Sequence, residues 1–210
     1  MNTPFSQRCQ VWDVPTRIFH WLMAFGFTAC YLSGENDRWA LIHVTAGYMI
    51  LGLIIFRIVW GFIGTQHARF KNFIRGPKTV IEYMICLCRR KTEHYAGHNP
   101  AGAIAILLLI VFGVIVTVSG VMVYEELDWA GLEEIHETSS NAMLVIVLVH
   151  ITGVIISSIL HKENLVGAMI SGCKPHCEGE TIGNTYRWLG VLIGFCAIGF
   201  WFWSFKEKIF

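Results

Sequence analysis

The most constraining feature of the sequence is the stretch 136–161, HETSSNAMLVIVLVHITGVIISSILH. After a polar start it is apolar except for His150, and it is long enough to cross a bilayer, which takes about 20 residues. A titratable ring at membrane depth costs free energy unless something binds it. The stretch therefore predicts a membrane-spanning helix with a functional histidine in its interior. The structural alternative is a buried histidine that hydrogen-bonds a neighbouring helix.

His136 and His150 are related by the helical period. They lie fourteen residues apart, which at about 100° per residue places them within about 40° on one face and roughly 21 Å apart along the axis. Two imidazoles on one face, near opposite leaflets, predict two stacked metal or haem sites inside a helical bundle. One buried structural histidine and one loop histidine remain the alternative for this helix taken alone.

Composition and hydropathy predict an all-α integral membrane protein. Hydrophobic residues make up 54% of the chain, the net charge is +1 and the mean hydropathy is +0.53, which excludes a nucleic-acid-binding protein. Four spans are predicted to form a transmembrane bundle in a domain covering 1–172. A loop and a fifth, C-terminal span occupy 173–210. The predicted spans are 17–32, 41–63, 101–123, 136–161 and 188–205.

The loops predict the orientation in the membrane. The segment 66–100 carries seven lysines and arginines, and it contains a half-apolar stretch, 79–87, that resembles a surface helix. The loop 124–134 is acidic. Because basic loops stay in the cytoplasm, we expect a cytoplasmic N-terminus, although Lys206 and Lys208 at the predicted outer end weakly oppose this assignment.

Seven cysteines are scattered along the chain, and their odd number predicts no disulfide framework. No CxxCH motif is present for covalent haem, and no four-cysteine run for an iron–sulfur cluster. Cys173, His176 and Cys177 could bind a metal, but an ordinary loop explains them better. No glycine-rich nucleotide-binding motif occurs. Redox chemistry in this chain would therefore be shared with partners.

Four histidines fall at two depths. His43 and His136 lie near the outer ends of their spans, whereas His20 and His150 lie deeper toward the inside. A six-coordinate haem takes two axial nitrogens from facing helices, so these four residues match two haems. Zinc would need thiolate or carboxylate ligands that these depths do not offer.

Several neighbours share the ligand faces. Gly47 follows His43 by four residues and Gly153 follows His150 by three, leaving bare backbone where a flat macrocycle fits; Gly113 and Gly120 could serve similarly, although small residues also simply allow close helix packing. Arg57 follows His43 by fourteen residues and lies level with the inner pair. A buried cation needs an anion, so Arg57, with Arg17, predicts a contact with haem propionates. Snorkelling of Arg57 to the interface is the alternative.

Several motifs resemble the bacterial cytochrome b561 family, which includes the b-type cytochrome subunits of nickel–iron hydrogenases. The resemblance covers residues 11–172 and is carried by TRIFHW, IHVTAGY, FRIVWGFIG, GHNPAGA, IHETSSNAMLVIVLVH and HKENLVGAMISG. It implies two haems b in a bacterial inner-membrane bundle, with four axial ligands: His20, His43, His136 and His150. It also implies electron transfer between membrane quinone and a redox partner. His98 and Asn99 match a family motif where a propionate or quinone would be met.

Three functions compete at this point. The leading hypothesis is an electron-transfer subunit whose acidic outer face docks a basic periplasmic cytochrome c or a hydrogenase-type or reductase subunit. The second is a superoxide:quinone oxidoreductase, which would need a cationic outer surface. The third is a non-redox membrane protein.

The remaining histidines have other expected roles. His161 is a rival inner ligand that we interpret as structural or as a propionate contact. We expect three histidines to be solvated loop residues: His67, His94 and His176.

Overall fold

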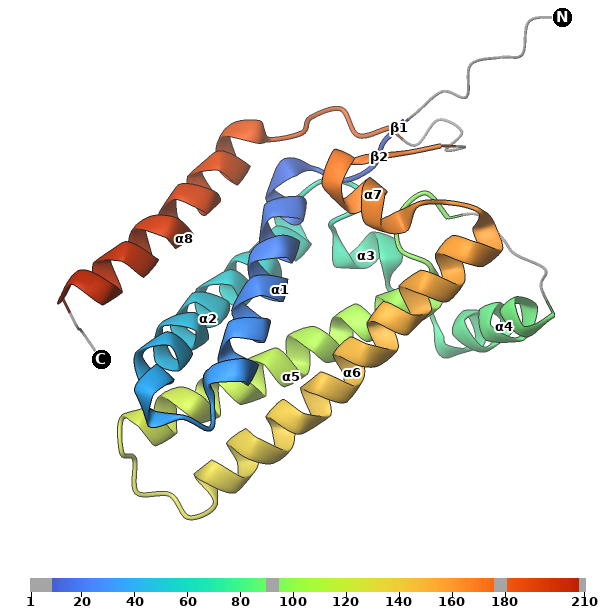
Figure 1. The fold of residues 1–210 in the computed structure, drawn as a ribbon. Coiled ribbons are helices and arrows are strands. Elements are labelled where there is room, and N and C mark those ends of the chain that lie inside the picture. The colour runs from blue at the N-terminus through green and yellow to red at the C-terminus, as the bar shows by residue number, and fades with distance from the viewer. Residues whose placement is uncertain (1–8, 90–94, 176–180, 208–210) are drawn as a thin grey trace, which may run out of the picture.

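A computed structural model describes residues 9–89, 95–175 and 181–207. Five long helices dominate the described chain (Figure 1). Their bounds lie within a few residues of the five predicted spans: α1 Val14–Ser33, α2 Ala40–Ile63, α5 Pro100–Tyr124, α6 Leu132–His161 and α8 Arg187–Glu207.

Local sequence signals set the helix ends. Asp13 caps α1 by accepting a hydrogen bond from the Thr16 amide, and Pro15 occupies the first turn, where its missing N–H costs nothing. Asn99 caps α5 in the same way, through the amide of Gly102. At the C-terminal end of α6, Lys162 adopts a left-handed backbone conformation that ends the helix.

Helices α1, α2, α5 and α6 form the bundle. α5 packs along α6, α1 along α2, and α2 also contacts α5, while α8 flanks the outside of α1 and α2 (Figure 1). We name the end where α5 and α6 are joined the outer end, and the opposite end the inner end, after the predicted orientation. The protein is thus an all-α membrane bundle with an additional C-terminal apolar helix.

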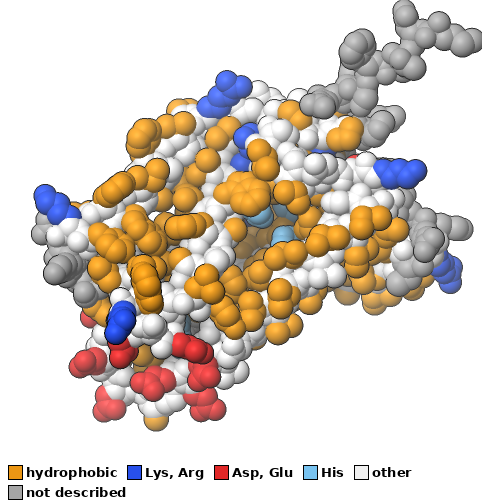
Figure 2. Space-filling model, in the orientation of Figure 1, with side chains coloured by type: hydrophobic (Ala, Val, Ile, Leu, Met, Phe, Trp, Pro, Cys, Tyr) orange, Lys and Arg blue, Asp and Glu red, His pale blue; other side chains and the backbone are white. Residues whose placement is uncertain are grey.

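Length and hydropathy identify four helices that could cross a membrane within the described chain. They cover Asp37–Ile63, Pro100–Tyr124, Leu132–His161 and Arg187–Lys206. The remaining long helix, α1, has 20 residues and carries Arg17 and His20, which lower its hydropathy. It packs against both α2 and α8, which gives it the same membrane setting as these neighbours. Apolar side chains are spread over the visible face between its charged ends (Figure 2), as expected of helices in contact with lipid.

The inner end is closed by short elements. They are β1 Cys9–Gln10, α3 Phe70–Phe73, α4 Pro77–Cys88, α7 Leu165–Ser171 and β2 Cys173–Lys174; a single turn, η1 Asp37–Trp39, precedes α2 at the outer end. α4 is the predicted surface helix. The other short elements were not predicted: α7 lies between the fourth and fifth predicted spans, and β2 lies in the predicted loop that begins at residue 173. β1 pairs antiparallel with β2, and Cys9 opposes Lys174.

Two further features of this end depart from expectation. Cys9 is disulfide-bonded, which the scattered cysteines did not indicate. Asp13 is fully buried, and besides capping α1 it accepts hydrogen bonds from Trp60 Nε1 at 3.2 Å and Thr65 Oγ1 at 2.5 Å. Because those donors lie at the end of α2, this one carboxylate joins the start of α1 to the end of α2.

Candidate haem sites

The outer pair of histidines is in direct ring contact. His43 on α2 and His136 on α6 have ring centres 6.0 Å apart and ring planes inclined by 76°. Two imidazoles that share one metal ion across bonds of about 2 Å have ring centres roughly 6 Å apart. The spacing of these two rings therefore fits a metal held between them.

Hydrogen bonds fix the tautomer of both rings. His43 Nδ1 lies 2.9 Å from the carbonyl oxygen of Cys30 on α1, and His136 Nδ1 lies 2.9 Å from that of Val116 on α5. A carbonyl oxygen can only accept, so each Nδ1 carries the proton and each Nε2 keeps a lone pair. This orientation by a backbone carbonyl is the usual outer contact of a metal-binding histidine.

The inner pair is set less closely. His20 on α1 and His150 on α6 lie near enough to interact electrostatically, but no ring contact joins them within the described residues. The Nδ1 of His20 is buried without a hydrogen-bond partner there. Figure 2 shows histidine side chains on the floor of a hollow in the apolar surface, between α1 and α6. An apolar-walled hollow with imidazoles at its floor has the chemistry of a haem pocket.

The glycines of the ligand faces divide into two kinds. A Cβ added at Gly47 or Gly153 would meet open space, which leaves room for a flat group beside those helices. The space beside Gly113 and Gly120 is instead occupied by other side chains. A Cβ added at Gly113 would lie 2.8 Å from Ile54 Cδ1, and one added at Gly120 would lie 2.8 Å from His136 Cε1. Gly120 is therefore the position that lets the His136 ring lie against α5.

Arg57 is buried at the inner end. Only 3% of its surface is exposed, so its guanidinium does not reach water as the snorkelling alternative requires. It lies over the rings of Phe70 and Phe73, 5.0 and 5.8 Å from their centres. One Nη atom has no hydrogen-bond partner within the described chain. Phe70 and Phe73 were not singled out in the sequence, although their spacing of three residues beside a basic stretch was the available signal.

His98 is buried between two aromatic rings. Its ring centre lies 4.6 Å from that of Trp12 and 4.8 Å from that of Phe73, and its Nδ1 lacks a hydrogen-bond partner among the described residues. Burial, followed by the positive charges of Arg57 and Lys174, holds the pKa of His98 well below its usual range. Asn99 next to it uses its side-chain oxygen to cap α5.

Buried polar atoms without a protein partner gather at the inner end of the bundle. Within the described residues they include atoms of Thr16, Arg17, His20, Arg57, Arg69 and His98. Such atoms are costly unless a ligand or ordered water satisfies them, and three of them are on arginines. The donor set therefore fits an anionic group, such as the propionates of a haem bound between His20 and His150.

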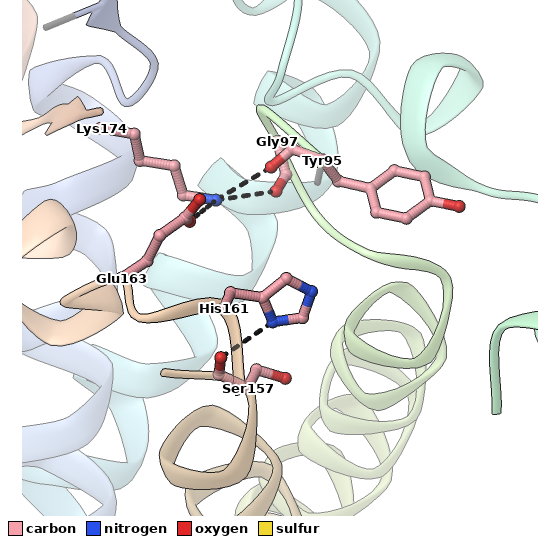
Figure 3. A network of polar contacts seen from close by, with 6 residues as sticks. All are labelled: Tyr95, Gly97, Ser157, His161, Glu163 and Lys174. Carbon is pink, nitrogen blue, oxygen red and sulfur yellow. Dashed lines mark hydrogen bonds and ion pairs between the residues drawn. The ribbon is translucent and has the colours of Figure 1, made fainter. Parts of the chain in front are cut away.

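The other histidines lie in several settings. His67 is 7% exposed and its ring centre lies 6.4 Å from that of Trp12. The expectation of a solvated residue is therefore wrong, because the segment between α2 and α3 packs against Trp12. His161 Nδ1 donates to the carbonyl of Ser157 one turn earlier (Figure 3). His94, His176 and Cys177 lie outside the described residues, and the described ones contain no group of three metal-ligating side chains.

The outer end is acidic. Figure 2 shows red side chains gathered at the end of the molecule where α5 and α6 are joined. The residues of this loop and the start of α6 include Glu125, Glu126, Asp128, Glu133 and Glu134. Tyr48 on α2 donates a hydrogen bond to Glu125 at 3.3 Å, which links the loop to the helix that carries His43.

Comparisons with known proteins agree with this arrangement. A family model described as prokaryotic cytochrome b561 matches residues 11–172. A probable Ni/Fe-hydrogenase B-type cytochrome subunit from Bradyrhizobium diazoefficiens is 24% identical, covering 77% of this chain and 84% of that protein. Its counterpart in Rhizobium leguminosarum bv. viciae is 25% identical (79% and 88%), and a probable Ni/Fe-hydrogenase 1 B-type cytochrome subunit of Escherichia coli K12 is 24% identical (84% and 94%). No solved structure matches the chain.

Proposed function

Since this chain belongs to the prokaryotic cytochrome b561 family, and is thus a membrane b-type cytochrome of electron transfer, we propose that it works through two bis-histidine haems b. They would connect the quinone pool to a redox partner. The observation that carries the proposal is the His43–His136 pair, whose rings are spaced for a shared metal and whose Nδ1 protons are both donated to backbone carbonyls.

The proposed ligand sets follow the two depths. His43 and His136 hold the outer haem, and His20 and His150 hold the inner one. A bound haem supplies one-electron redox chemistry. The protein orients the imidazoles, offers open helix backbone at Gly47 and Gly153, and surrounds the sites with apolar side chains that exclude water.

We assign the inner polar residues to charge compensation. Among the described residues, Arg57 and Arg17 each have a buried guanidinium nitrogen without a hydrogen-bond partner. A propionate would compensate the charge of each guanidinium and accept its hydrogen bonds. His98 lies electrostatically close to Arg57 and His150, so its ring faces either a propionate or a quinone at the inner site. Asn99 would take part through the backbone around the α5 cap, because its side-chain oxygen is already used.

The partner would dock at the outer end. The similar proteins are named as hydrogenase subunits, and the acidic loop 124–134 suits a basic surface on a hydrogenase-type subunit or on a periplasmic cytochrome c. Placing the basic segment 66–100 in the cytoplasm gives a bacterial inner-membrane protein with a cytoplasmic N-terminus.

A superoxide:quinone oxidoreductase is the second candidate. Its substrate is an anion, and electrostatic steering of an anion requires a cationic approach surface. The loop at the outer end carries Glu125, Glu126 and Asp128, which repel superoxide at the site where it would arrive. The electrostatics therefore favour electron transfer with a protein partner.

Haem stoichiometry tests the proposal. We expect a pyridine haemochrome assay on the purified protein to give two haems b per chain, both removed by acid–acetone because no CxxCH motif is present. One haem per chain, or haem that survives the extraction, would contradict it. An absorption spectrum without a Soret band would instead support the hypothesis of a non-redox membrane protein.

A further inference from the structure

A buried lysine joins three segments at the inner end (Figure 3). Lys174 Nζ lies 3.1 Å from the carbonyl oxygen of Tyr95, 3.5 Å from that of Gly97 and 3.9 Å from Glu163 Oε2. Lys174 is 6% exposed and Glu163 is 9% exposed. We call this group the inner clamp: the Lys174 ammonium, the Glu163 carboxylate and the two carbonyls.

The inner clamp satisfies the chemistry of a buried ammonium. The group has three N–H donors and no acceptor, and here it meets three acceptors from two parts of the chain, the segment 95–97 and Glu163. A buried cation is tolerated only when its charge is compensated and its donors are bonded. Glu163 supplies the charge, and the two carbonyls supply the remaining bonds. The carbonyls are consequently held at fixed positions relative to the end of α6.

The two carbonyls belong to the residues that lead into His98. Between them, Ala96 packs against the core cluster of Cys9, Val11, Trp12 and Ala168. Gly97 approaches the ring of His67 so closely that a Cβ there would lie 2.9 Å from His67 Nδ1. The backbone before His98 is therefore held by the clamp on one side and by packing on the other.

Lys174 also fixes the opposite wall of the His98 pocket. It lies in β2, which pairs with β1 through Cys9 and Gln10, and the backbone amides of Val11 and Trp12 both donate to the Gly172 carbonyl. Trp12 is the residue whose ring lies 4.6 Å from His98. One side chain thus connects the segment that carries His98 with the strand that precedes its aromatic neighbour.

We propose that Lys174 is a positioning residue for the inner site, and that with Glu163 it holds His98 between Trp12 and Phe73 at the place where the site meets its propionate or quinone. This role rests on the proposed function for the identity of the ligand. Lys174 lies two residues beyond the family match, which ends at residue 172, so the segment that follows the family domain completes the inner site.

The first test measures the backbone and needs no ligand. Hydrogen exchange is followed by mass spectrometry on the full chain in detergent, comparing wild type with Lys174→Met. We expect amides of the segment 95–98 to exchange roughly tenfold faster or more, because hydrogen bonds to a charged group oppose local opening. Lys78→Met is the matched control, since Lys78 is also paired with a glutamate, Glu82 at 4.0 Å, but is 90% exposed. It should leave the segment unchanged.

A second variant keeps the test decisive if Lys174→Met fails to fold. Lys174→Met leaves Glu163 buried without its cation, which can destabilise the whole chain. The double variant Lys174→Met/Glu163→Leu removes both charges and should fold, while still releasing the two carbonyls. Lys174→Arg keeps a cation and its donors and should restore much of the protection. Unchanged exchange at 95–98 in the double variant would overturn the proposal.

Enzyme kinetics with a quinone analogue distinguish failure of the positioning role from failure of the proposed function. We expect the double variant to keep its haems but to raise the KM for a soluble quinone analogue several-fold, with a smaller change in kcat, and we expect the same of His98→Ala. If His98→Ala raises the KM and the double variant does not, the positioning role fails while the proposed function stands. If wild type lacks the second haem, the proposed function fails, and the exchange experiment still decides whether the clamp exists.

Discussion

His43 and His136 face each other across the outer half of the bundle with ring centres 6.0 Å apart, although they are far apart in the sequence, on α2 and α6. Neither helix sets this approach alone. The carbonyl of Cys30 on α1 orients one ring and that of Val116 on α5 orients the other. The outer site is therefore a product of all four bundle helices.

Gly120→Ala should weaken the outer haem selectively. The added Cβ would lie 2.8 Å from His136 Cε1 and 3.0 Å from Nδ1, so the ring must move away from the Val116 carbonyl. Loss of such an outer hydrogen bond typically costs about 10–100-fold in metal affinity. Haem content and the electron paramagnetic resonance spectrum measure the effect. Gly52→Ala, where a Cβ meets nothing, is the control; equal spectra for the two variants would count against the assignment.

Arg57→Ala should leave both haems bound and lower the reduction potential of the inner one. A nearby buried cation favours the extra electron, and the loss of even one kcal/mol corresponds to about 43 mV for a one-electron couple. Spectroelectrochemical titration measures both potentials. Arg38→Ala, an exposed arginine before α2, should change neither. A larger shift of the outer haem than of the inner one would refute the position that we assign to Arg57.

His98 predicts a pH dependence of stability. Its pKa is lowered by burial and by Arg57 and Lys174, so the unfolded chain binds this proton more readily than the folded one. Stability is therefore retained above the ordinary histidine pKa of about 6.5 and falls as the pH drops below it, by at most about 1.4 kcal/mol per pH unit. Thermal unfolding at pH 7.5 and 5.5 should show a smaller loss for His98→Phe than for wild type. An equal loss would mean that His98 does not titrate differently on folding.

The reduced protein should react faster with a quinone analogue than with superoxide-related oxidants. The reason is the acidic outer loop with Glu125, Glu126 and Asp128, which disfavours approach of an anion. Stopped-flow spectroscopy of the haem bands at low and high salt measures both reactions. A near-diffusion-limited reaction with superoxide would instead support the enzyme hypothesis.

The sequence predicted the parts of the fold that depend on local patterns. Long apolar runs located the helices to within a few residues, and the fourteen-residue spacing placed His136 and His150 on one face of α6. The burial of Arg57 followed from the same period. Hydropathy and helical period are sufficient for these features because each depends on neighbours along one helix.

Features that depend on distant segments were not predictable. Lys174 meets Tyr95 and Gly97 because β2 pairs with β1, and a two-residue strand has no period to detect. His67 looked like a loop residue because the signal for its burial is Trp12, more than fifty positions away. Cys9 became disulfide-bonded despite a cysteine pattern without a framework. Contacts of this kind become visible only when the three-dimensional structure is known.

Haem loss in single histidine variants tests the central claim most directly. His43→Ala and His136→Ala should each remove the same haem, and His20→Ala and His150→Ala should each remove the other, as followed by haem content and by the potential of the haem that remains. His161→Ala tests the rival inner ligand at the last residue of α6, and it should keep both haems. If His43→Ala and His136→Ala remove different haems, or if His161→Ala removes the inner haem while His150→Ala does not, the two-pair account is contradicted.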